Sequence, residues 1–369
     1  MNKALVFFLA GILIIGGVHA RPAAAAAAKD RWENTLAEAR KEGTIKIYGQ
    51  VGPELRVALT KAFKEELGLE LELVPGKGIE VLTRFRTEWQ AGLPSADILL
   101  GGATSLLPVP ELYAAWDRLE PLLLLPEILD PRAWPNARLP FTDHQKKLIP
   151  IALQVNQLLV VNTDMVKPGQ IKSFRDLLQP QWKGKMALFD PTLVGPGQEW
   201  VKLLLAKAYG PVEGEAFLRK FAAQEPMITR DSRLQSEWVA RGRYPVTVGL
   251  DSQSTYKMHK SGGPITRLAA EEGTFLSGGG SYLVMPAKRP HHYAAIAVLN
   301  WLLTARGQEI YSKGYGAPPA RLGVKTEGIS PLASPFPGEK IYVQDEEDII
   351  VATKKAEEAA KRIFAPLLK

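Results

Sequence analysis

The sequence predicts an α/β protein of two lobes with a ligand cleft between them. Strands and helices alternate along the chain in two separate series, which is typical of mostly parallel sheets covered by helices. Most of the expected strands end in turns of glycine and polar residues. The chain of 369 residues is also too long for one ordinary hydrophobic core, so two lobes are expected.

The N-terminus predicts export. Lys3 precedes an apolar run over Ala4–Val18, and Val18-His19-Ala20 is a small-residue cleavage pattern. We therefore expect a signal peptide over 1–20 and an alanine-rich spacer over 21–28. An uncleaved anchor is the alternative, although the run is short for a membrane span of about 20 residues. The chain has no cysteine, which excludes a lipid-modified cysteine and disulfides, and the predicted location is the periplasm.

Composition excludes several classes of function. The formal net charge is +7, but lysines and arginines alternate with acids, so we expect no nucleic-acid partner. A mildly basic chain is compatible with an anionic ligand. The chain has no cysteine nucleophile, no G-x-S-x-G elbow and no H-E-x-x-H helix, so we expect no enzyme and no cofactor. The weaker alternative is a carboxylate pair, Asp190 and Asp251, at strand ends.

The first series begins with a helix over Trp32–Glu42, which Gly43 ends. Three strands then alternate with helices, and Leu55, Leu59 and Phe63 mark the apolar face of the first of these helices. In such sheets ligands lie beyond the carboxyl ends of the strands, so the three exit loops should face one side. The strands with their exit loops are Thr44–Tyr48 with 50–53, Leu69–Val74 with 76–78, and Asp97–Leu100 with 101–105.

A proline-rich connection over Leu107–Pro140 leads to the extended segment Leu148–Asn162, which we expect to cross into the second lobe. A return crossing is expected near Gly273–Ser281. The second series has Ser232 as the predicted N-cap of a helix over Arg233–Arg241. Its other predicted elements are strands over Lys185–Phe189, Pro226–Thr229 and Pro245–Leu250, and later helices over His292–Tyr311 and Glu346–Phe364.

Four segments, taken in order, resemble the family 1 extracellular solute-binding proteins of bacteria, in the branch often labelled iron receptors of ABC importers. The segments are SFRDLLQPQWKGKMALFDP at 173–191, RDSRLQSEWVARGRYPVTVG at 230–249, NWLLTARGQ at 300–308, and residues 316–321. The resemblance covers most of the chain after the N-terminal run. It implies the type II periplasmic-binding-protein fold, in which two α/β lobes are joined by two crossing strands. It also implies ligand capture by hinge closure.

The resemblance further implies an organisation and partners. Lobe I should comprise 29–152 and 276–369, including the C-terminal helices, and lobe II should comprise 153–275. The partners would be a small-molecule ligand and an ABC permease with its ATPase in the inner membrane, and we expect a monomer. A periplasmic sensor subunit that signals instead of transporting is the alternative with the same fold.

The candidate ligand-binding residues lie at strand exits, where glycines and helix N-termini leave backbone N–H donors free. From lobe I they are Gly52, Lys77, Gly102, Thr104 and Ser105; from lobe II, Thr192, Arg230, Ser232, Arg233 and Asp251; and at the hinge, Gln154 and Asn156. Structural alternatives stay open for some of them. Ser232 could be a helix cap alone, Arg230 and Arg233 could pair with Glu237 at the surface, and Lys77 could be solvated.

The predicted ligand is an organic anion: a carboxylate, a phosphate ester or a phosphonate. Ferric receptors of this fold are expected to present several tyrosinate oxygens, often from adjacent tyrosines. This chain has no Tyr-Tyr pair, and Asp251-Ser252 follows the strand where such a pair could stand. Its tyrosines are dispersed, Tyr256, Tyr282 and Tyr315 among them. We therefore expect no metal site, and ferric iron as the ligand is the alternative.

Overall fold

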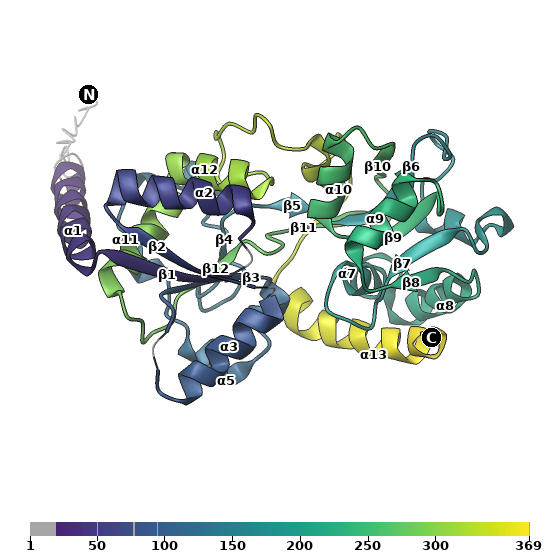
Figure 1. The fold of residues 1–369 in the computed structure, drawn as a ribbon, viewed down its shortest axis with the longest axis horizontal. Helices are drawn as coiled ribbons and strands as arrows, with labels where there is room; N and C mark the ends of the chain where they lie inside the picture. Colours follow the sequence, from purple (N-terminus) through teal and green to yellow (C-terminus); the bar gives the residue numbers. More distant parts are fainter. Residues whose placement is uncertain (1–19, 50, 77, 94, 369) are drawn as a thin grey trace, which may run out of the picture.

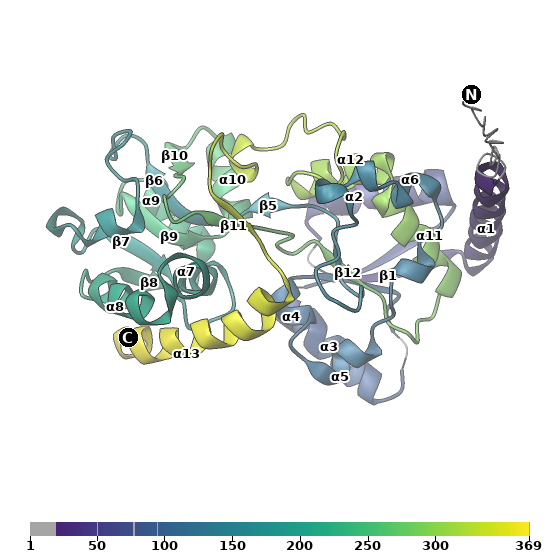
Figure 2. The same ribbon diagram turned by 180° about the vertical axis from the view of Figure 1, so that it is seen from behind.

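The computed structural model describes residues 20–49, 51–76, 78–93 and 95–368. The chain forms two α/β lobes that lie side by side and meet at a waist (Figures 1 and 2). Each lobe contains a five-stranded sheet, and a third sheet of three strands lies between them. The predicted two-lobed α/β architecture is confirmed.

Lobe I is built on the sheet β2-β1-β3-β12-β4. β1 pairs in parallel with β2 and β3, whereas β12 runs antiparallel to β3 and β4. The strands are β1 (Thr44–Gly49), β2 (Glu70–Pro75), β3 (Ile98–Gly101), β4 (Ile149–Pro150) and β12 (Tyr282–Val284). The helices are α1 (Ala20–Glu42), α2 (Pro53–Ala62), α3 (Gly78–Gln90), α4 (Ala103–Leu106), α5 (Pro110–Ala115), α6 (Pro126–Leu129), α11 (His292–Leu303) and α12 (Ala305–Tyr315).

Alternation along β1 divides the core of lobe I between the two faces of its sheet. Ile45 and Ile47 pack with the buried face of α2, where Leu55 and Leu59 lie, as the spacing of four predicts. Tyr48 points to the other face and packs with Phe85 of α3. The sheet is therefore covered by helices on both sides, which leaves its strand ends as the place for a ligand.

Lobe II is built on the sheet β10-β6-β9-β7-β8, with helices around it. Its core gathers Phe174, Phe217 and Phe221 around Trp200, and each of these three rings contacts that of Trp200 edge to face. The strands are β6 (Gln157–Asn162), β7 (Met186–Phe189), β8 (Met227–Thr229), β9 (Val246–Leu250) and β10 (Ile265–Arg267). The helices are α7 (Pro196–Leu203), α8 (Gly210–Ala222), α9 (Ser232–Ala240) and α10 (Ser252–Lys260).

Three strands cross between the lobes. The two predicted crossings are β5 (Gln154–Val155) and β11 (Thr274–Ser277), which pair antiparallel. A third strand, β13 (Ile341–Val343), pairs in parallel with β11 and was not predicted. After α12 the chain first reaches lobe II, where Glu339 pairs with Arg267 of β10, and β13 then runs alongside β11 back toward lobe I. The waist is therefore a three-stranded sheet.

The last helix, α13 (Thr353–Phe364), packs on lobe II, as its position below that lobe shows (Figure 1). Its buried side chains, Ala356, Ala359, Ala360 and Phe364, belong to the lobe II core. The assignment of 276–369 to lobe I was therefore wrong for this final part. The apolar stripe of α13 predicted that one face of the helix is buried. Which lobe covers that face depends on the path of the chain through the third crossing, and this crossing was not predicted.

The N-terminal predictions are only partly covered. Residues 1–19 of the predicted signal peptide lie outside the described residues. The alanine-rich stretch 21–28 is helical and continues into the rest of α1, where a spacer was expected. Within the part of the chain that the structure describes, no helix has the length and apolar character needed to cross a membrane.

Short turns complete the fold. Three π-helical segments adjoin longer helices: η1 (Phe63–Leu67), η7 (Leu204–Ala208) and η9 (Asp348–Ala352). The 3-10 turns are η2 (Glu120–Leu122), η3 (Pro131–Ala133), η4 (Pro135–Ala137), η5 (Phe174–Leu178), η6 (Pro180–Trp182), η8 (Pro331–Ala333) and η10 (Ala365–Leu367).

Candidate functional site

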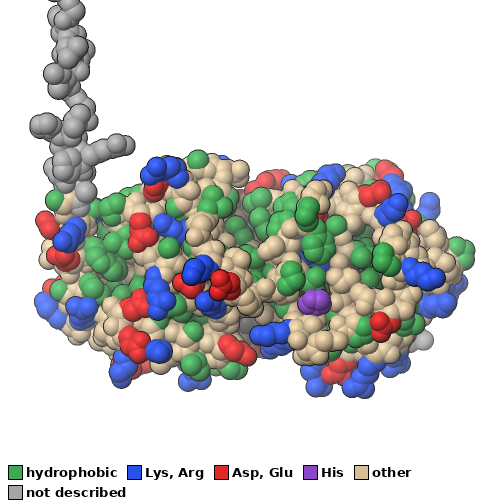
Figure 3. Space-filling view, turned by 90° about the horizontal axis from the view of Figure 1, so that it is seen from above, with side chains coloured by type: hydrophobic (Ala, Val, Ile, Leu, Met, Phe, Trp, Pro, Cys, Tyr) green, Lys and Arg blue, Asp and Glu red, His purple; other side chains and the backbone are tan. Residues whose placement is uncertain are grey.

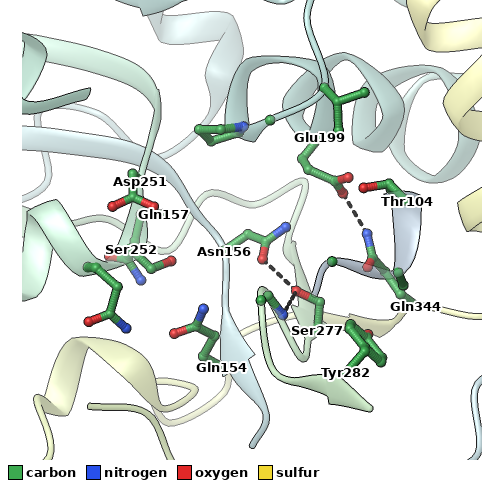
Figure 4. A pocket seen from close by; sticks show the side chains of 18 of the residues that line it. Thr104, Gln154, Asn156, Gln157, Glu199, Asp251, Ser252, Ser277, Tyr282 and Gln344 are labelled. Carbon is green, nitrogen blue, oxygen red and sulfur yellow. Dashed lines mark hydrogen bonds between the residues drawn. The ribbon is translucent and has the colours of Figure 1, made fainter. Parts of the chain in front are cut away.

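A cavity of about 180 Å³ lies at the waist and is lined by both lobes and by the crossing strands. Seen from above, the two lobes form rounded halves on either side of this waist (Figure 3). The close-up shows amide, hydroxyl and carboxylate side chains pointing into the space between them (Figure 4). The cavity is therefore polar and is assembled from segments far apart in the sequence.

Lobe I contributes the exit of β3 and the loop between β11 and β12. Gly102, Ala103 and Thr104 follow β3 and line the cavity. In the other loop, the N–H of Gly280 donates to the hydroxyl of Tyr315 at 2.9 Å. Gly279 has φ +57°, a conformation that favours glycine, and a Cβ there would lie 2.4 Å from Nε2 of Gln154, so the side chain of Gln154 would have to move.

Lobe II contributes the exits of β7 and β9. Glu199 stands in the first turn of α7, and Asp251 and Ser252 stand where α10 begins. Asp251 is the N-cap of α10, because its Oδ1 accepts from the N–H of Ser254 at 2.9 Å. These elements come together because β7 and β9 are neighbouring parallel strands.

The crossing strands provide the middle of the site. Gln154, Asn156 and Gln157 come from the first crossing, and Ser277 comes from the second. The hydroxyl of Ser277 donates to Oδ1 of Asn156 at 2.9 Å, so the two crossings are joined by side chains inside the cavity (Figure 4). A ligand that contacts Asn156 would thus touch the strands that connect the two lobes.

Two carboxylates give the cavity its charge. Among the described residues, no lysine or arginine lines it, whereas Glu199 and Asp251 do. Glu199 lies 2.8 Å from the fully buried ammonium of Lys202, and Nε2 of Gln344 donates to it at 2.5 Å. The charge of Glu199 is thus largely balanced by Lys202, whereas Asp251 has no such counter-charge among the residues that the structure describes.

Burial keeps the tyrosines of the site protonated. Burial raises the pKa of Tyr282 to about 12. It also raises the pKa of Tyr315 and that of Tyr256, whose hydroxyl donates to Oε1 of Gln154. At neutral pH these phenols are hydroxyl groups. Over the described part of the chain, no three His, Asp or Glu side chains come close enough together to hold a metal ion.

The raised pKa of Tyr282 predicts a loss of stability in base. An unfolded tyrosine ionises near pH 10.0, whereas the folded one holds its proton to about 12. Between these values the folded state binds more protons, so its stability falls as pH rises, by about 1.4 kcal/mol per pH unit for this group. Tyr282→Phe should flatten the fall in urea denaturation across this range. The control, Tyr293→Phe at an exposed position of α11, should not; an unchanged slope in Tyr282→Phe would contradict the prediction.

Five of the candidate residues line the cavity, and they come from both lobes and the hinge: Gly102, Thr104, Gln154, Asn156 and Asp251. Lys77 lies outside the described residues. Gly52 is the N-cap of α2, Ser105 lies inside α4, and Thr192 donates to Asp190 at 2.7 Å; none of these three lines the cavity.

The three candidates after β8 do not line the cavity either. Arg233 is 84% exposed and lies 3.7 Å from Glu237, as the surface-pair alternative predicts for it. Arg230 instead donates to Asp190 at 2.8 Å, so its predicted pairing with Glu237 was wrong. Ser232 is not the helix cap, because the side chain of Asp231 caps α9. The physical reason is the strand order: β8 is the edge strand of its sheet, so its exit is displaced from the waist.

Several lining residues were not among the candidates. Ser252 directly follows Asp251, and Tyr282 and Tyr315 stood out only as dispersed tyrosines. Gln344 gave no local signal, since it follows the unpredicted third crossing. The other lining residues outside the candidate set are Ala103, Gln157, Val194, Gly195, Pro196, Glu199, Leu250, Gln253, Ser277, Gly279 and Gly280.

Comparison with known proteins gives one family match. A model described as bacterial extracellular solute-binding protein matches residues 58–334. These residues include most of both lobes, the first two crossings and most of the cavity lining.

Solved structures share the fold at low identity. The iron- and citrate-bound protein IdiA (FutA) from Trichodesmium has a TM-score of 0.68 and 19% identity, covering 88% of this chain and 99% of its own. The apo ferric ion-binding protein A from Pasteurella haemolytica has a TM-score of 0.69 and 17% identity, covering 87% and 98%. AfuA from Actinobacillus pleuropneumoniae, solved with fructose-6-phosphate, has a TM-score of 0.66 and 17% identity, covering 88% and 98%. The chain therefore has the periplasmic-binding-protein fold that the sequence predicts.

Proposed function

The chain belongs to the bacterial extracellular solute-binding proteins, and from this we propose that it captures a small organic anion in the periplasm and delivers it to an ABC importer. The observation that supports this best is the cavity, where side chains of both lobes and of the hinge converge on one small space. A ligand bound there would favour the form in which the lobes are closed. The permease and ATPase in the inner membrane would accept that form. We also propose the family 1 branch, on the four segments of the sequence that resemble it.

Neutral donors would hold the anion. The hydroxyls of Thr104, Ser252 and Tyr315 and the amides of Gln154 and Gln253 can donate to a carboxylate or a phosphate ester. Nε2 of Gln253 is buried and has no hydrogen-bond partner among the described residues, so it is a donor that a ligand oxygen would satisfy. The bound fructose-6-phosphate of AfuA shows that this fold accommodates a phosphate ester.

Ferric iron is the second candidate, because two carboxylate and two phenol side chains line the same cavity: Glu199, Asp251, Tyr282 and Tyr315. Two of the three similar structures named above are a ferric ion-binding protein and a protein that holds iron with citrate. Oxygen ligands suit hard cations. The raised pKa values of Tyr282 and Tyr315 weigh against it, because each phenol would have to release a firmly held proton.

Thermal denaturation of the refolded, ligand-free protein tests the proposal. The probes are small carboxylates, phosphate esters and phosphonates, with ferric citrate and neutral sugars as comparisons. A ligand at about 100 times its Kd stabilises by about 2.7 kcal/mol. Stabilisation by an organic anion is expected. Stabilisation by ferric citrate alone would overturn the anion proposal, and a genomic neighbour that is a receptor kinase rather than a permease would favour the sensor alternative.

A change of charge inside the cavity separates the two ligands. Asn156→Asp keeps the oxygen that accepts from Ser277 but adds a negative charge. Affinity for the organic anion should fall by at least about tenfold, whereas affinity for ferric iron should not fall. Asn136→Asp makes the same chemical change at an exposed position outside the cavity and should leave both affinities unchanged.

A further inference from the structure

At one end of the cavity, two side-chain oxygens, one of Gln157 and one of Asp251, accept no hydrogen bond from the described part of the chain. The first is Oε1 of Gln157, a side chain that is 1% exposed and lines the cavity. Its orientation is fixed, because Nε2 donates to the carbonyl oxygens of Val155 and Leu332, each at 3.0 Å. Oε1 therefore cannot exchange places with Nε2, and among the described residues it has no partner. A buried acceptor left in this way destabilises the protein unless a ligand donates a hydrogen bond to it.

The second acceptor is the carboxylate of Asp251. Its Oδ1 accepts from the N–H and the hydroxyl of Ser254. Within the part of the chain that the structure describes, its Oδ2 accepts no hydrogen bond. In the pairing of β6 with β9, Gln157 lies opposite Leu250, the residue before Asp251. The two acceptors are therefore neighbours, as Figure 4 shows.

This arrangement restricts the kind of anion that fits. A ligand whose charge reached this end would meet the carboxylate of Asp251, and nothing cationic lines the cavity in the described residues to offset it. The two adjacent acceptors, Gln157 and Asp251, instead need hydrogen-bond donors from the ligand. Hydroxyl groups supply donors without bringing a second charge into the cavity, and they suit the uncharged amide of Gln157 as well as the carboxylate.

We infer that the ligand is a polyhydroxylated anion, such as a sugar acid or a sugar phosphate, whose hydroxyl groups donate to Gln157 and Asp251. Its anionic group lies toward the neutral donors of the rest of the cavity. This inference rests on the proposed function and narrows it from organic anions in general to those with several hydroxyl groups. Gln157 and Asp251 are then the residues that determine specificity.

Isothermal titration of the refolded protein with matched pairs of anions tests the inference. The pairs are gluconate with hexanoate and glucose 6-phosphate with hexyl phosphate, which differ mainly in their hydroxyl groups. In at least one pair the hydroxylated member should bind at least about tenfold more tightly, the effect of one charge-assisted hydrogen bond. Equal or tighter binding of the hydroxyl-free member in both pairs overturns the inference and leaves the proposed function standing. Tighter binding of 6-aminohexanoate than of gluconate also overturns the inference, because an ammonium group rather than a hydroxyl group would then donate to Gln157 and Asp251.

Two variants assign the effect to these residues. Asp251→Asn keeps a good N-cap for α10 and removes the charge, so the ratio of affinities within the pair should fall several-fold. Gln157→Leu removes the unpartnered acceptor and should lower the ratio too; its melting temperature without ligand shows whether the fold is intact. Unchanged ratios in both folded variants overturn the inference. Binding of neither member of either pair overturns the proposed function, and the inference falls with it.

Discussion

Replacing Arg267 by alanine is expected to lower the free energy of unfolding by about 3–5 kcal/mol. Arg267 ends β10, and its side chain is 2% exposed while that of its partner Glu339 is 1% exposed. Its guanidinium contacts both oxygens of Glu339, at 2.5 and 2.8 Å, and donates to the carbonyl of Leu332 at 2.9 Å. It also lies 3.7 Å from the ring centre of Phe336.

The effect is large because, among the described residues, Arg267 is the one cation that neutralises the buried carboxylate of Glu339. All these partners belong to the segment between α12 and β13, so the pair attaches the third crossing to lobe II. Urea denaturation measures the loss. Arg306→Ala is the control, because its pair with Glu66 is exposed and should contribute about 1 kcal/mol or less.

Two further outcomes decide the interpretation. The double variant Arg267→Met with Glu339→Leu should recover much of the stability, since two apolar side chains leave no buried charge. A single Arg267→Ala variant no less stable than Arg306→Ala would show that the segment is not held by this pair.

Gly249→Ala is expected to cost about 2–5 kcal/mol and to abolish ligand binding. Gly249, in β9, has φ +63°, a conformation that costs an L-residue about 1–2 kcal/mol. A Cβ there would also lie 2.7 Å from the backbone nitrogen of Gly197, and overpacking of this kind costs about 1–3 kcal/mol. Because backbone cannot rotate away, α7 would have to shift from β9.

That shift would reach the cavity from two sides. Glu199 follows Gly197 in α7, and Asp251 follows Gly249 at the end of β9, so both carboxylates depend on this contact. Denaturation and titration with the identified ligand measure the two effects. Gly169→Ala is the matched control, because Gly169 has φ +78° but open space around it. Gly169→Ala should lose only the stability that the positive φ costs an L-residue, and it should bind the ligand normally. Equal losses of stability and of binding in the two variants would contradict the role of the Gly197–Gly249 contact.

The elements of both lobes could be predicted well because their signals are local. The spacing of Leu55, Leu59 and Phe63 and the alternation along β1 state which faces are buried, whatever they pack against. Strand exits could be located for the same reason, and this brought Gly102, Thr104 and Asp251 into the candidate set. Gln154 and Asn156 were found because polar residues interrupted an apolar crossing segment.

The prediction of cavity residues failed at other positions, because the places of these residues in the fold depend on strand order. Arg230 and Arg233 follow a strand just as Asp251 does, yet β8 lies at the edge of the sheet and β9 near its centre. Tyr315 and Gln344 reach the cavity from α12 and from the third crossing, elements distant from it along the chain. Their chemistry was visible in the sequence, but not their position.

The sequence by itself determined the two-lobed α/β fold, the strand exits as the place for a ligand, and the resemblance to solute-binding proteins. Only the tertiary structure decided which exits meet, that the described cavity lining carries two carboxylates without a lysine or arginine, and that α13 packs on lobe II. The physical reason is the separation along the chain of the residues that set each feature. Periodicity, caps and glycine turns are set by residues a few positions apart, whereas the charge and the hydrogen-bond partners of a cleft arise from side chains that only sheet order and chain crossings bring together.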